Sequence, residues 1–131
     1  MISPLKIQVR FSDIDLMGHV NNAVYLNYFE AARMHYLLTI FGEDRDWKKD
    51  GIILRKNEIE YIAPVFLKDE PIISVFLESI GTKSFTLIYE LNVNGEIKTV
   101  GKSVLVYFDS TTNRTKELTE ELKNSLKLLK K

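Results

Sequence analysis

The chain has 131 residues, the usual size of one domain with a single core, and leaves little room for a second core. Its 18 basic and 18 acidic residues give a formal net charge of zero, without the basic excess of a nucleic-acid binder. The absence of cysteine excludes disulfides, thiolate catalysis and cysteine-ligated zinc or iron–sulfur sites. We therefore expect residues 1–131 to form a single domain that does not bind nucleic acid.

The hydropathy pattern predicts neither export nor membrane insertion. Residues 1–6 lack the apolar stretch of a signal peptide. No apolar run approaches the ~20 residues that a membrane-spanning helix needs. We expect a cytoplasmic protein without a membrane partner, whose zero net charge leaves little repulsion between copies.

The first element predicted in chain order is a strand. Ile7, Val9 and Phe11 alternate with polar residues, which is the period of a strand with one buried face. A polar, turn-rich stretch follows from Ser12 to Asn22, with Gly18 inside it.

The next element is a long helix from Ala23 to Phe41, a stretch without Gly or Pro. Its apolar residues occupy most of the circumference, which predicts a buried helix. Asn21 or Asn22 is the expected N-cap, and Gly42 is the expected stop.

The remainder is predicted to be mainly β-structure, followed by a short helix. Asn94-Gly95 is the strongest short signal for a two-residue hairpin turn. A leucine stripe beginning at Leu118 predicts an amphipathic helix from about Thr119, with acidic residues in its first turn and lysines in its last. The four predicted strands are Ile52–Ile62, Pro71–Ile80, Lys83–Val93 and Glu96–Phe108.

This order of elements is typical of an α+β fold with an antiparallel sheet. About five strands wrapped around the long helix would explain why that helix is apolar on most sides. The strand containing Ile72–Leu77 is apolar on both faces, whereas one face of an antiparallel sheet usually meets water. We therefore expect a homo-oligomer, either a dimer or a tetramer.

Two partial motifs fail on inspection. Asp13–Gly18 begins like a calcium loop, but Met17 and Val24 occupy positions where that loop needs oxygen ligands. Gly101-Lys102-Ser103 begins like the turn that carries a serine nucleophile, but the closing glycine is missing. With two histidines and no second cluster, the chain is expected to hold neither a metal nor a cofactor.

The segment from Val9 to Tyr25 concentrates the polar chemistry of the chain. Two carboxylates, a histidine and two asparagines lie between a strand end and the start of a buried helix. From the residue types alone, this pattern is compatible with a reactive site and equally with a polar loop of turns and caps.

The same segment resembles the acyl-CoA thioesterase family typified by 4-hydroxybenzoyl-CoA thioesterase, which has the hot-dog fold. The resemblance covers nearly the whole chain and is most specific in its first third. The matching stretches are Phe11, Asp13-Ile14-Asp15, Gly18, His19-Val20-Asn21-Asn22, Tyr25 and Phe29-Glu30-Ala31-Ala32-Arg33, then Ile59-Glu60-Tyr61, Pro64 and Lys83-Ser84-Phe85.

The resemblance implies hydrolysis of an acyl-CoA thioester, with Asp15 as the catalytic carboxylate, acting as general base or as nucleophile. It also implies that the backbone N–H at Asn22 polarises the thioester carbonyl. Elementary physics agrees, because a helix N-terminus offers unpaired N–H donors and a partial positive charge. His19 is a second candidate for catalysis, although the type enzyme of the family does not have it.

The remaining site residues receive supporting roles. Asp13, Gly18 and Asn21 are expected to order the substrate loop. Lys83, with its neighbour Thr82, resembles the family's basic region near the coenzyme A phosphates. The type enzyme has arginines where this chain has Gly81 and Thr82, and a solvated lysine at a strand end is the alternative.

Three other functions stay open from the sequence. The acyl group could come from acyl carrier protein instead of coenzyme A. A dehydratase or hydratase on the same fold would pair a carboxylate with a histidine, although the spacing here does not match its usual motif. A non-catalytic acyl-binding module is the third.

Overall fold

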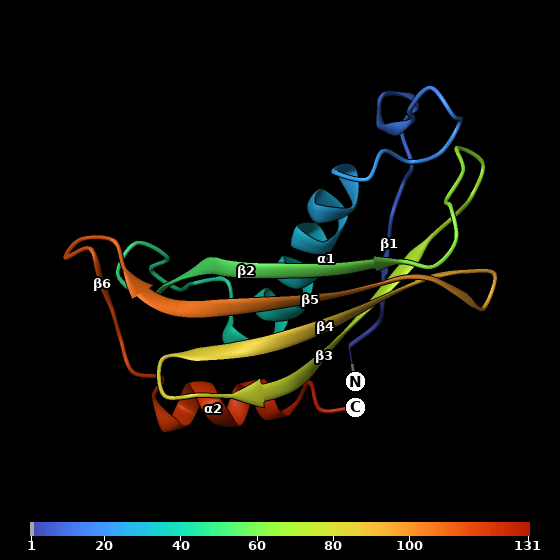
Figure 1. Ribbon diagram of the computed structural model, residues 1–131. Coiled ribbons are helices and arrows are strands. Elements are labelled where there is room, and N and C mark those ends of the chain that lie inside the picture. The colour runs from blue at the N-terminus through green and yellow to red at the C-terminus, as the bar shows by residue number, and fades with distance from the viewer. Residues whose placement is uncertain (1) are drawn as a thin grey trace. The chain divides into compact units, whose positions relative to one another are not determined.

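The computed structural model describes residues 2–131 (Figure 1). The strands form one sheet in the order β1-β3-β4-β5-β2, with β6 beside β5. This antiparallel sheet with one long helix packed against it confirms the predicted α+β fold. The elements are β1 (Leu5–Lys6), the 3-10 helix η1 (Phe11–Asp13), α1 (Val24–Phe41), β2 (Gly51–Tyr61), β3 (Ile72–Ile80), β4 (Ser84–Val93), β5 (Glu96–Asp109), β6 (Arg114–Thr115) and α2 (Glu120–Lys127).

The residues gather into two compact units. The first holds residues 2–36, 59–75 and 89–101, and the second holds residues 37–58, 76–88 and 102–131. Helix α1 and strands β2 to β5 each contribute residues to both units. Each unit is therefore described on its own.

The core of the first unit forms between α1 and the sheet. The ring of Phe29 stacks on Tyr89, with centroids 4.7 Å apart and planes 10° from parallel. Gly101 permits this approach, because a Cβ there would lie 2.5 Å from Cε2 of Phe29. The buried side of α1 includes Tyr25, Tyr28, Phe29 and Ala32, whereas Leu26, Asn27, Glu30 and Ala31 are exposed. In this chain the helix is buried on one side, and not around most of its circumference as its composition predicted.

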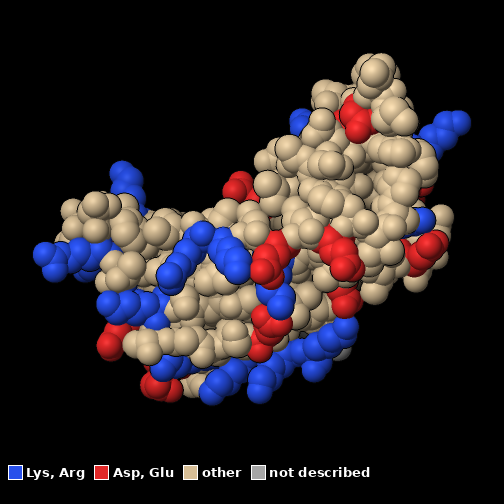
Figure 2. All heavy atoms as spheres, viewed as in Figure 1, with Lys and Arg blue, Asp and Glu red and all other residues tan. Residues whose placement is uncertain are grey.

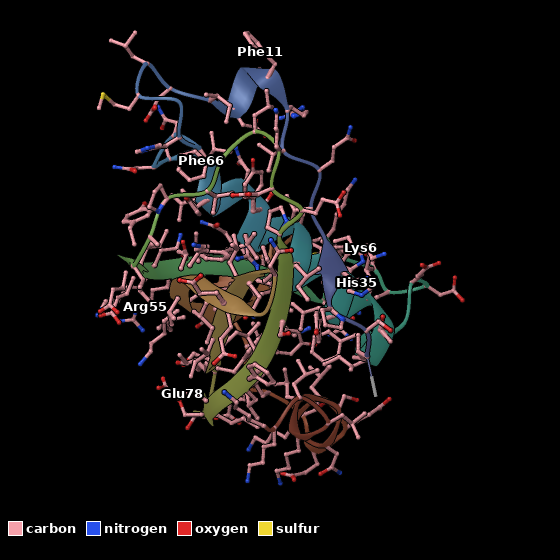
Figure 3. All side chains as sticks on the ribbon, turned by 90° about the vertical axis from the view of Figure 1, so that its right-hand side faces the viewer. Lys6, Phe11, His35, Arg55, Phe66 and Glu78 are labelled. Atoms are coloured by element: carbon pink, nitrogen blue, oxygen red, sulfur yellow. The ribbon has the colours of Figure 1, made fainter. Side chains whose placement is uncertain are left out.

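The first strand is shorter than its alternating pattern predicted. Strand β1 pairs antiparallel with β3 only through Leu5 and Lys6. Val9 is buried as expected, but Phe11 is 84% exposed and begins η1 (Figure 3). The extended backbone ends at Arg10, because the Asp13 carboxylate accepts from the Arg10 backbone N–H and the chain turns there. The prediction of a buried Phe11 was therefore wrong.

In the second unit, the loop between α1 and β2 is held by aromatic and charged contacts. The guanidinium of Arg45 lies 5.1 Å from the ring of Phe41, 5.8 Å from Trp47 and 5.7 Å from Tyr107. Asp50 accepts from the Tyr107 hydroxyl at 2.6 Å and from Lys116 Nζ at 2.8 Å. The hydrogen bonds from Lys116 and Tyr107 lower the pKa of Asp50 from its ordinary value, against the opposing effect of burial.

Helix α2 confirms its predicted position and polarity. The hydroxyl of Thr119 accepts from the Leu122 N–H at 3.1 Å and caps the first turn. After the helix, the chain runs beside β3, where the Leu77 N–H donates to the Leu129 carbonyl at 2.9 Å. The predicted leucine stripe is buried at all four positions: Leu118, Leu122, Leu126 and Leu129.

The outer face of the sheet in the second unit carries ion pairs. Lys102 Nζ lies 2.8 Å from Glu78, and Lys56 Nζ lies 3.1 Å from Glu58. Figure 2 shows acidic and basic side chains interspersed on the visible face, with neither sign covering it alone. The Lys131 ammonium lies 4.9 Å from the ring of Phe76, so this lysine covers part of the apolar strand. Among residues 2–131, no helix is long and apolar enough to cross a membrane.

Candidate active site

A tight turn in the first unit brings His19 beside Asp15. The Asp15 N–H donates to the His19 carbonyl at 2.8 Å, and the Gly18 N–H donates to the Asp15 carbonyl at 3.1 Å. Gly18 has a φ of +82°, a left-handed conformation that glycine adopts without steric strain. The polar loop is thus a compact turn whose two ends face one another.

The carboxylate of Asp15 is fixed by backbone amides on one of its oxygens. Oδ1 accepts from the Met17 N–H at 2.9 Å and from the His19 N–H at 3.2 Å. Among residues 2–131, no cation lies within ion-pairing distance of this half-buried carboxylate, and Oδ2 accepts no hydrogen bond. One oxygen therefore sets the orientation of the group, and the other is available to a ligand.

The start of α1 leaves the backbone N–H of Asn22 available as a donor. Asn21 acts as the cap: its side-chain oxygen accepts from the Ala23 N–H at 2.9 Å, and its carbonyl accepts from the Val24 N–H at 2.9 Å. The Asn22 N–H has no acceptor among the described residues. This agrees with the general shortage of acceptors for the first donors of a helix.

These groups line one cavity of about 220 Å³. Three of the residues that the resemblance assigned to the site, Asp15, His19 and Asn22, lie on it. Tyr25 and Tyr61 also line it, although no sequence pattern assigned them a role in the site. The remaining lining residues are Val20, Ile62, Ala63 and Pro64.

Tyr61 joins the end of β2 to the start of α1. Its hydroxyl donates to the Asn22 carbonyl at 2.8 Å, and its ring meets Tyr25 edge-on at 5.2 Å. Tyr25 is buried, and burial raises the pKa of its hydroxyl. The signal for Tyr61 was present in Ile59-Glu60-Tyr61, one of the stretches that carried the family resemblance.

His19 lines the cavity, and its ring packs against Phe66. The two rings meet edge-on, with centroids 5.2 Å apart. A larger groove of about 580 Å³ lies elsewhere in the first unit, lined by residues 6–9 and 67–72. That groove contains none of the predicted site residues, so the smaller cavity is the candidate site.

Asp13 lies behind the turn and outside the cavity lining. Its buried carboxylate accepts from the Tyr28 hydroxyl at 2.6 Å and from the Arg10 N–H at 2.9 Å, and its carbonyl accepts from the Asn21 N–H at 2.8 Å. Burial acts to raise the pKa of Asp13, but the hydrogen bonds from Tyr28 and Arg10 outweigh it and lower that pKa. Asp13 therefore joins the loop to the helix as a carboxylate.

Thr82 and Lys83 belong to the second unit and do not line the cavity. Lys83 Nζ lies 3.4 Å from the hydroxyl of Thr115, and the Thr82 carbonyl accepts from the Leu118 N–H at 2.9 Å. Their contact with coenzyme A stays a prediction.

Comparison with known proteins defines the class. Residues 9–126 match the model of the thioesterase-like superfamily. The chain belongs to this superfamily, and the expectations of a hot-dog fold and a thioester hydrolase are confirmed.

Individual relatives are similar over nearly the full chain. The uncharacterized protein YsmA of Bacillus subtilis (strain 168) is 31% identical over 124 residues, which cover 92% of this chain and 82% of YsmA. A thioesterase from Thermus thermophilus, solved with coenzyme A and zinc, is 32% identical with a TM-score of 0.84, over 96% of this chain and 92% of the other. A structure described as a predicted thioesterase from Bacillus stearothermophilus is 26% identical with a TM-score of 0.89, over 98% and 96% of the two chains.

Proposed function

We propose that the protein hydrolyses acyl-CoA thioesters and that Asp15 is its catalytic carboxylate. One observation carries the proposal: Asp15 and Asn22 line the same cavity, and neither Oδ2 of Asp15 nor the Asn22 N–H has a partner among the described residues. A nucleophilic or basic oxygen and an electrophilic donor are the two groups that acyl transfer requires.

The Asn22 N–H would bind the carbonyl oxygen of the thioester. When water or a carboxylate adds to this carbonyl, negative charge develops on its oxygen. A preorganised backbone N–H at a helix start stabilises that charge without reorganising. The hydrogen bond from Tyr61 to the Asn22 carbonyl supports this role, because it holds the neighbouring backbone in place.

Asp15 would drive the addition in one of two ways. As a general base, it takes a proton from water while the water oxygen bonds to the acyl carbon, and the C–S bond then breaks to release the thiolate. As a nucleophile, it forms a mixed anhydride with release of the thiolate, and water then cleaves the anhydride. Mass spectrometry of single-turnover mixtures distinguishes the two mechanisms. An enzyme mass increased by the mass of the acyl group would support the anhydride and therefore the nucleophilic role.

The decisive experiment replaces Asp15 by asparagine. The amide oxygen of Asp15→Asn can still accept from Met17 and His19, so we expect an unchanged fold. The loss of the carboxylate should reduce kcat for thiol release by about 10²- to 10⁴-fold. Circular dichroism and a thiol-release assay over several acyl-CoAs measure the two outcomes.

Asp46 offers a matched control. Its Oδ1 also accepts from two backbone N–H groups, those of Lys48 and Lys49 at 3.1 and 3.4 Å, and it lies away from the cavity lining. Asp46→Asn should leave turnover near the wild-type rate. A well-folded Asp15→Asn protein that turns over as fast as Asp46→Asn would refute the proposal.

We propose coenzyme A as the carrier of the acyl group. The Thermus thermophilus thioesterase, which is 32% identical, was solved with coenzyme A bound. Acyl carrier protein is the alternative carrier. Hydrolysis of the same acyl group from both carriers separates them, and a higher kcat/KM with acyl carrier protein would reject coenzyme A.

We also propose that the protein works as a homo-oligomer joined along β2. This strand ends the sheet, and eight of its eleven residues are exposed, including Ile53 and Leu54. A long exposed edge with apolar side chains is a template for pairing with another chain. Light scattering after gel filtration should give a multiple of 15.2 kDa for the wild type and a smaller mass for Leu54→Lys. Ile97→Lys, which changes an exposed residue of β5, is the control.

A further inference from the structure

The direction of the Asn22 N–H depends on the two peptide planes that meet at the Asn22 Cα. In the first plane, which is planar and trans, the Asn21 carbonyl and the Asn22 N–H point in opposite directions. The Asn21 carbonyl accepts from the Val24 N–H at 2.9 Å, and the Asn21 N–H donates to the Asp13 carbonyl at 2.8 Å. Backbone hydrogen bonds therefore hold the plane that contains the donor.

Side chains hold the second plane, which joins Asn22 to Ala23. The side-chain oxygen of Asn21 accepts from the Ala23 N–H at 2.9 Å, and the Asn22 carbonyl accepts from the Tyr61 hydroxyl at 2.8 Å. Asn21, Asn22 and Ala23 are all exposed, and the ends of helices fray. Of the two side chains, only that of Tyr61 comes from outside the turn, so it limits motion of the turn relative to the sheet.

Tyr61 is suited to this role because it is itself fixed. Its ring meets the ring of Tyr25 edge-on, with centroids 5.2 Å apart, and Tyr25 is buried. The next two residues, Ile62 and Ala63, both donate their N–H groups to the Lys98 carbonyl, at 2.9 and 3.0 Å. The hydroxyl of Tyr61 therefore connects the start of α1 to a strand end that is tied to β5.

We propose that Tyr61 is a positioning residue for thioester hydrolysis, which acts through the Asn22 carbonyl to hold the Asn22 N–H toward the oxygen of the substrate. The inference rests on the proposed thioesterase function and adds to it a residue of the sheet. A donor that is already oriented stabilises the developing charge without reorganising, whereas a donor that must first turn into place stabilises it less. The hydroxyl of Tyr61 should therefore affect kcat and leave KM unchanged.

The kinetic test replaces Tyr61 by phenylalanine, which removes the hydroxyl and keeps the ring beside Tyr25. We expect kcat for thiol release from acyl-CoA to fall about three- to tenfold, the factor that corresponds to one net hydrogen bond. An unchanged KM would place the lost interaction in the transition state. Circular dichroism checks the fold of the variant.

Tyr107→Phe is the matched control. The Tyr107 hydroxyl donates to Asp50 at 2.6 Å in the second unit, away from the cavity lining, so this variant also loses one tyrosine hydrogen bond. Its kcat should stay near the wild-type value. A folded Tyr61→Phe protein with the same kcat as Tyr107→Phe would overturn the proposal.

Nuclear magnetic resonance observes the donor directly. The probe is the ketone analogue of hexanoyl-CoA, in which a methylene group replaces the thioester sulfur, so that the carbonyl stays and hydrolysis is impossible. In protein labelled with ¹⁵N-asparagine, binding of the ketone should move the Asn22 amide proton downfield, and Asn22→Asp identifies its signal by loss of the label. We expect a smaller movement in Tyr61→Phe. An equal movement, even with a lower kcat, would mean that the hydroxyl acts on the substrate directly, and would also overturn the proposal.

The two measurements separate this inference from the proposed function. A wild type that releases no thiol would refute the function, and the Asn22 signal would then decide alone whether Tyr61 orients the donor. Thiol release that depends on Asp15, with equal kcat and equal Asn22 signals in wild type and Tyr61→Phe, would refute only the role of Tyr61. An Asn22 signal that does not move when the wild type binds the ketone would refute both Asn22 as the donor and Tyr61 as its positioning residue.

Discussion

The hydroxyl of Tyr28, on the buried side of α1, donates a 2.6 Å hydrogen bond to the buried carboxylate of Asp13. The two residues are fifteen positions apart and connect the turn that carries Asp15 to the helix that begins after Asn22. The pKa of the Tyr28 hydroxyl is raised by burial and by this carboxylate, so the phenol stays protonated and acts as the donor.

Replacing Tyr28 by phenylalanine should weaken the fold. A hydrogen bond to a buried charge contributes about 1.5 to 3 kcal/mol, so we expect a loss of this size in urea unfolding. Tyr36→Phe is the control, because Tyr36 is buried in the same helix and its hydroxyl has no hydrogen-bond partner among the described residues. Equal stability of the two variants would contradict the assigned role of the Tyr28 hydroxyl.

The same variant should change the acid sensitivity of the protein. The folded-state pKa of Asp13 lies below its ordinary value of 3.8, so its hydrogen bonds stabilise the fold above that pH. This stability is lost as the pH falls through the folded-state pKa. Without the Tyr28 hydroxyl, burial is less opposed and the pKa of Asp13 rises, so acid unfolding should begin at higher pH. Circular dichroism during acid titration measures this shift.

Gly101→Ala should destabilise the core of the first unit. The new methyl group would meet the ring of Phe29, which cannot move without leaving its stacked position on Tyr89. Overpacking of this kind costs about 1 to 3 kcal/mol. Gly81→Ala is the control, since its new Cβ would have the Ser84 hydroxyl oxygen as its nearest neighbour, at 3.2 Å. Denaturant unfolding of both variants measures the difference, and equal stabilities would disprove the steric role of Gly101.

His19→Gln should distinguish a proton donor from a structural residue. The contacts of His19 with Asp15 use the His19 backbone, so the substitution leaves the turn in place. A ring that protonates the departing thiolate would make kcat for acyl-CoA fall about a hundredfold. The fall should be much smaller for an aryl thioester, whose thiolate is a better leaving group. Equal losses on both substrates would assign the ring to positioning.

If Lys83 contacts the nucleotide phosphates of coenzyme A, Lys83→Ala should change the KM of coenzyme A substrates alone. The KM for acyl-CoA would rise about three- to tenfold, as expected for the loss of one partly exposed ionic contact. The KM for the corresponding acyl-pantetheine, which lacks those phosphates, should not change. Lys68→Ala removes a lysine of the first unit and serves as the control. An unchanged KM for acyl-CoA would leave Lys83 as a solvated lysine.

Features that depend on neighbouring residues were predictable from the sequence. Asn94 and Gly95 have φ values of +52° and +82°, as their hairpin turn requires, and Gly42 ends α1 with a φ of +89°. The cap at Thr119 involves residues only three positions apart. Each of these follows from a local preference that tertiary packing does not alter.

The polar half of the cavity was predictable for a similar reason. Asp15, His19 and Asn22 lie within eight residues, so one turn is enough to bring them together. Tyr61 comes from a strand 39 residues after Asn22, and only the pairing of distant segments places it there. Phe11 fits an alternating pattern, but the hydrogen bond from the Arg10 N–H to the Asp13 carboxylate turns the chain before it. The alternation of apolar and polar residues does not reveal that this hydrogen bond ends the extended backbone.

Because Trp47 lies in the second unit and contacts Arg45, its fluorescence allows the unfolding of that unit to be followed separately. Trp47 is the only tryptophan, so its fluorescence reports on the loop that Arg45 and Asp50 hold, whereas far-ultraviolet dichroism reports on the whole backbone. Should residues 1–131 unfold as one cooperative body, the two signals will change at the same denaturant concentration. If the two units differ in stability, the Trp47 emission and the ellipticity will change at different denaturant concentrations.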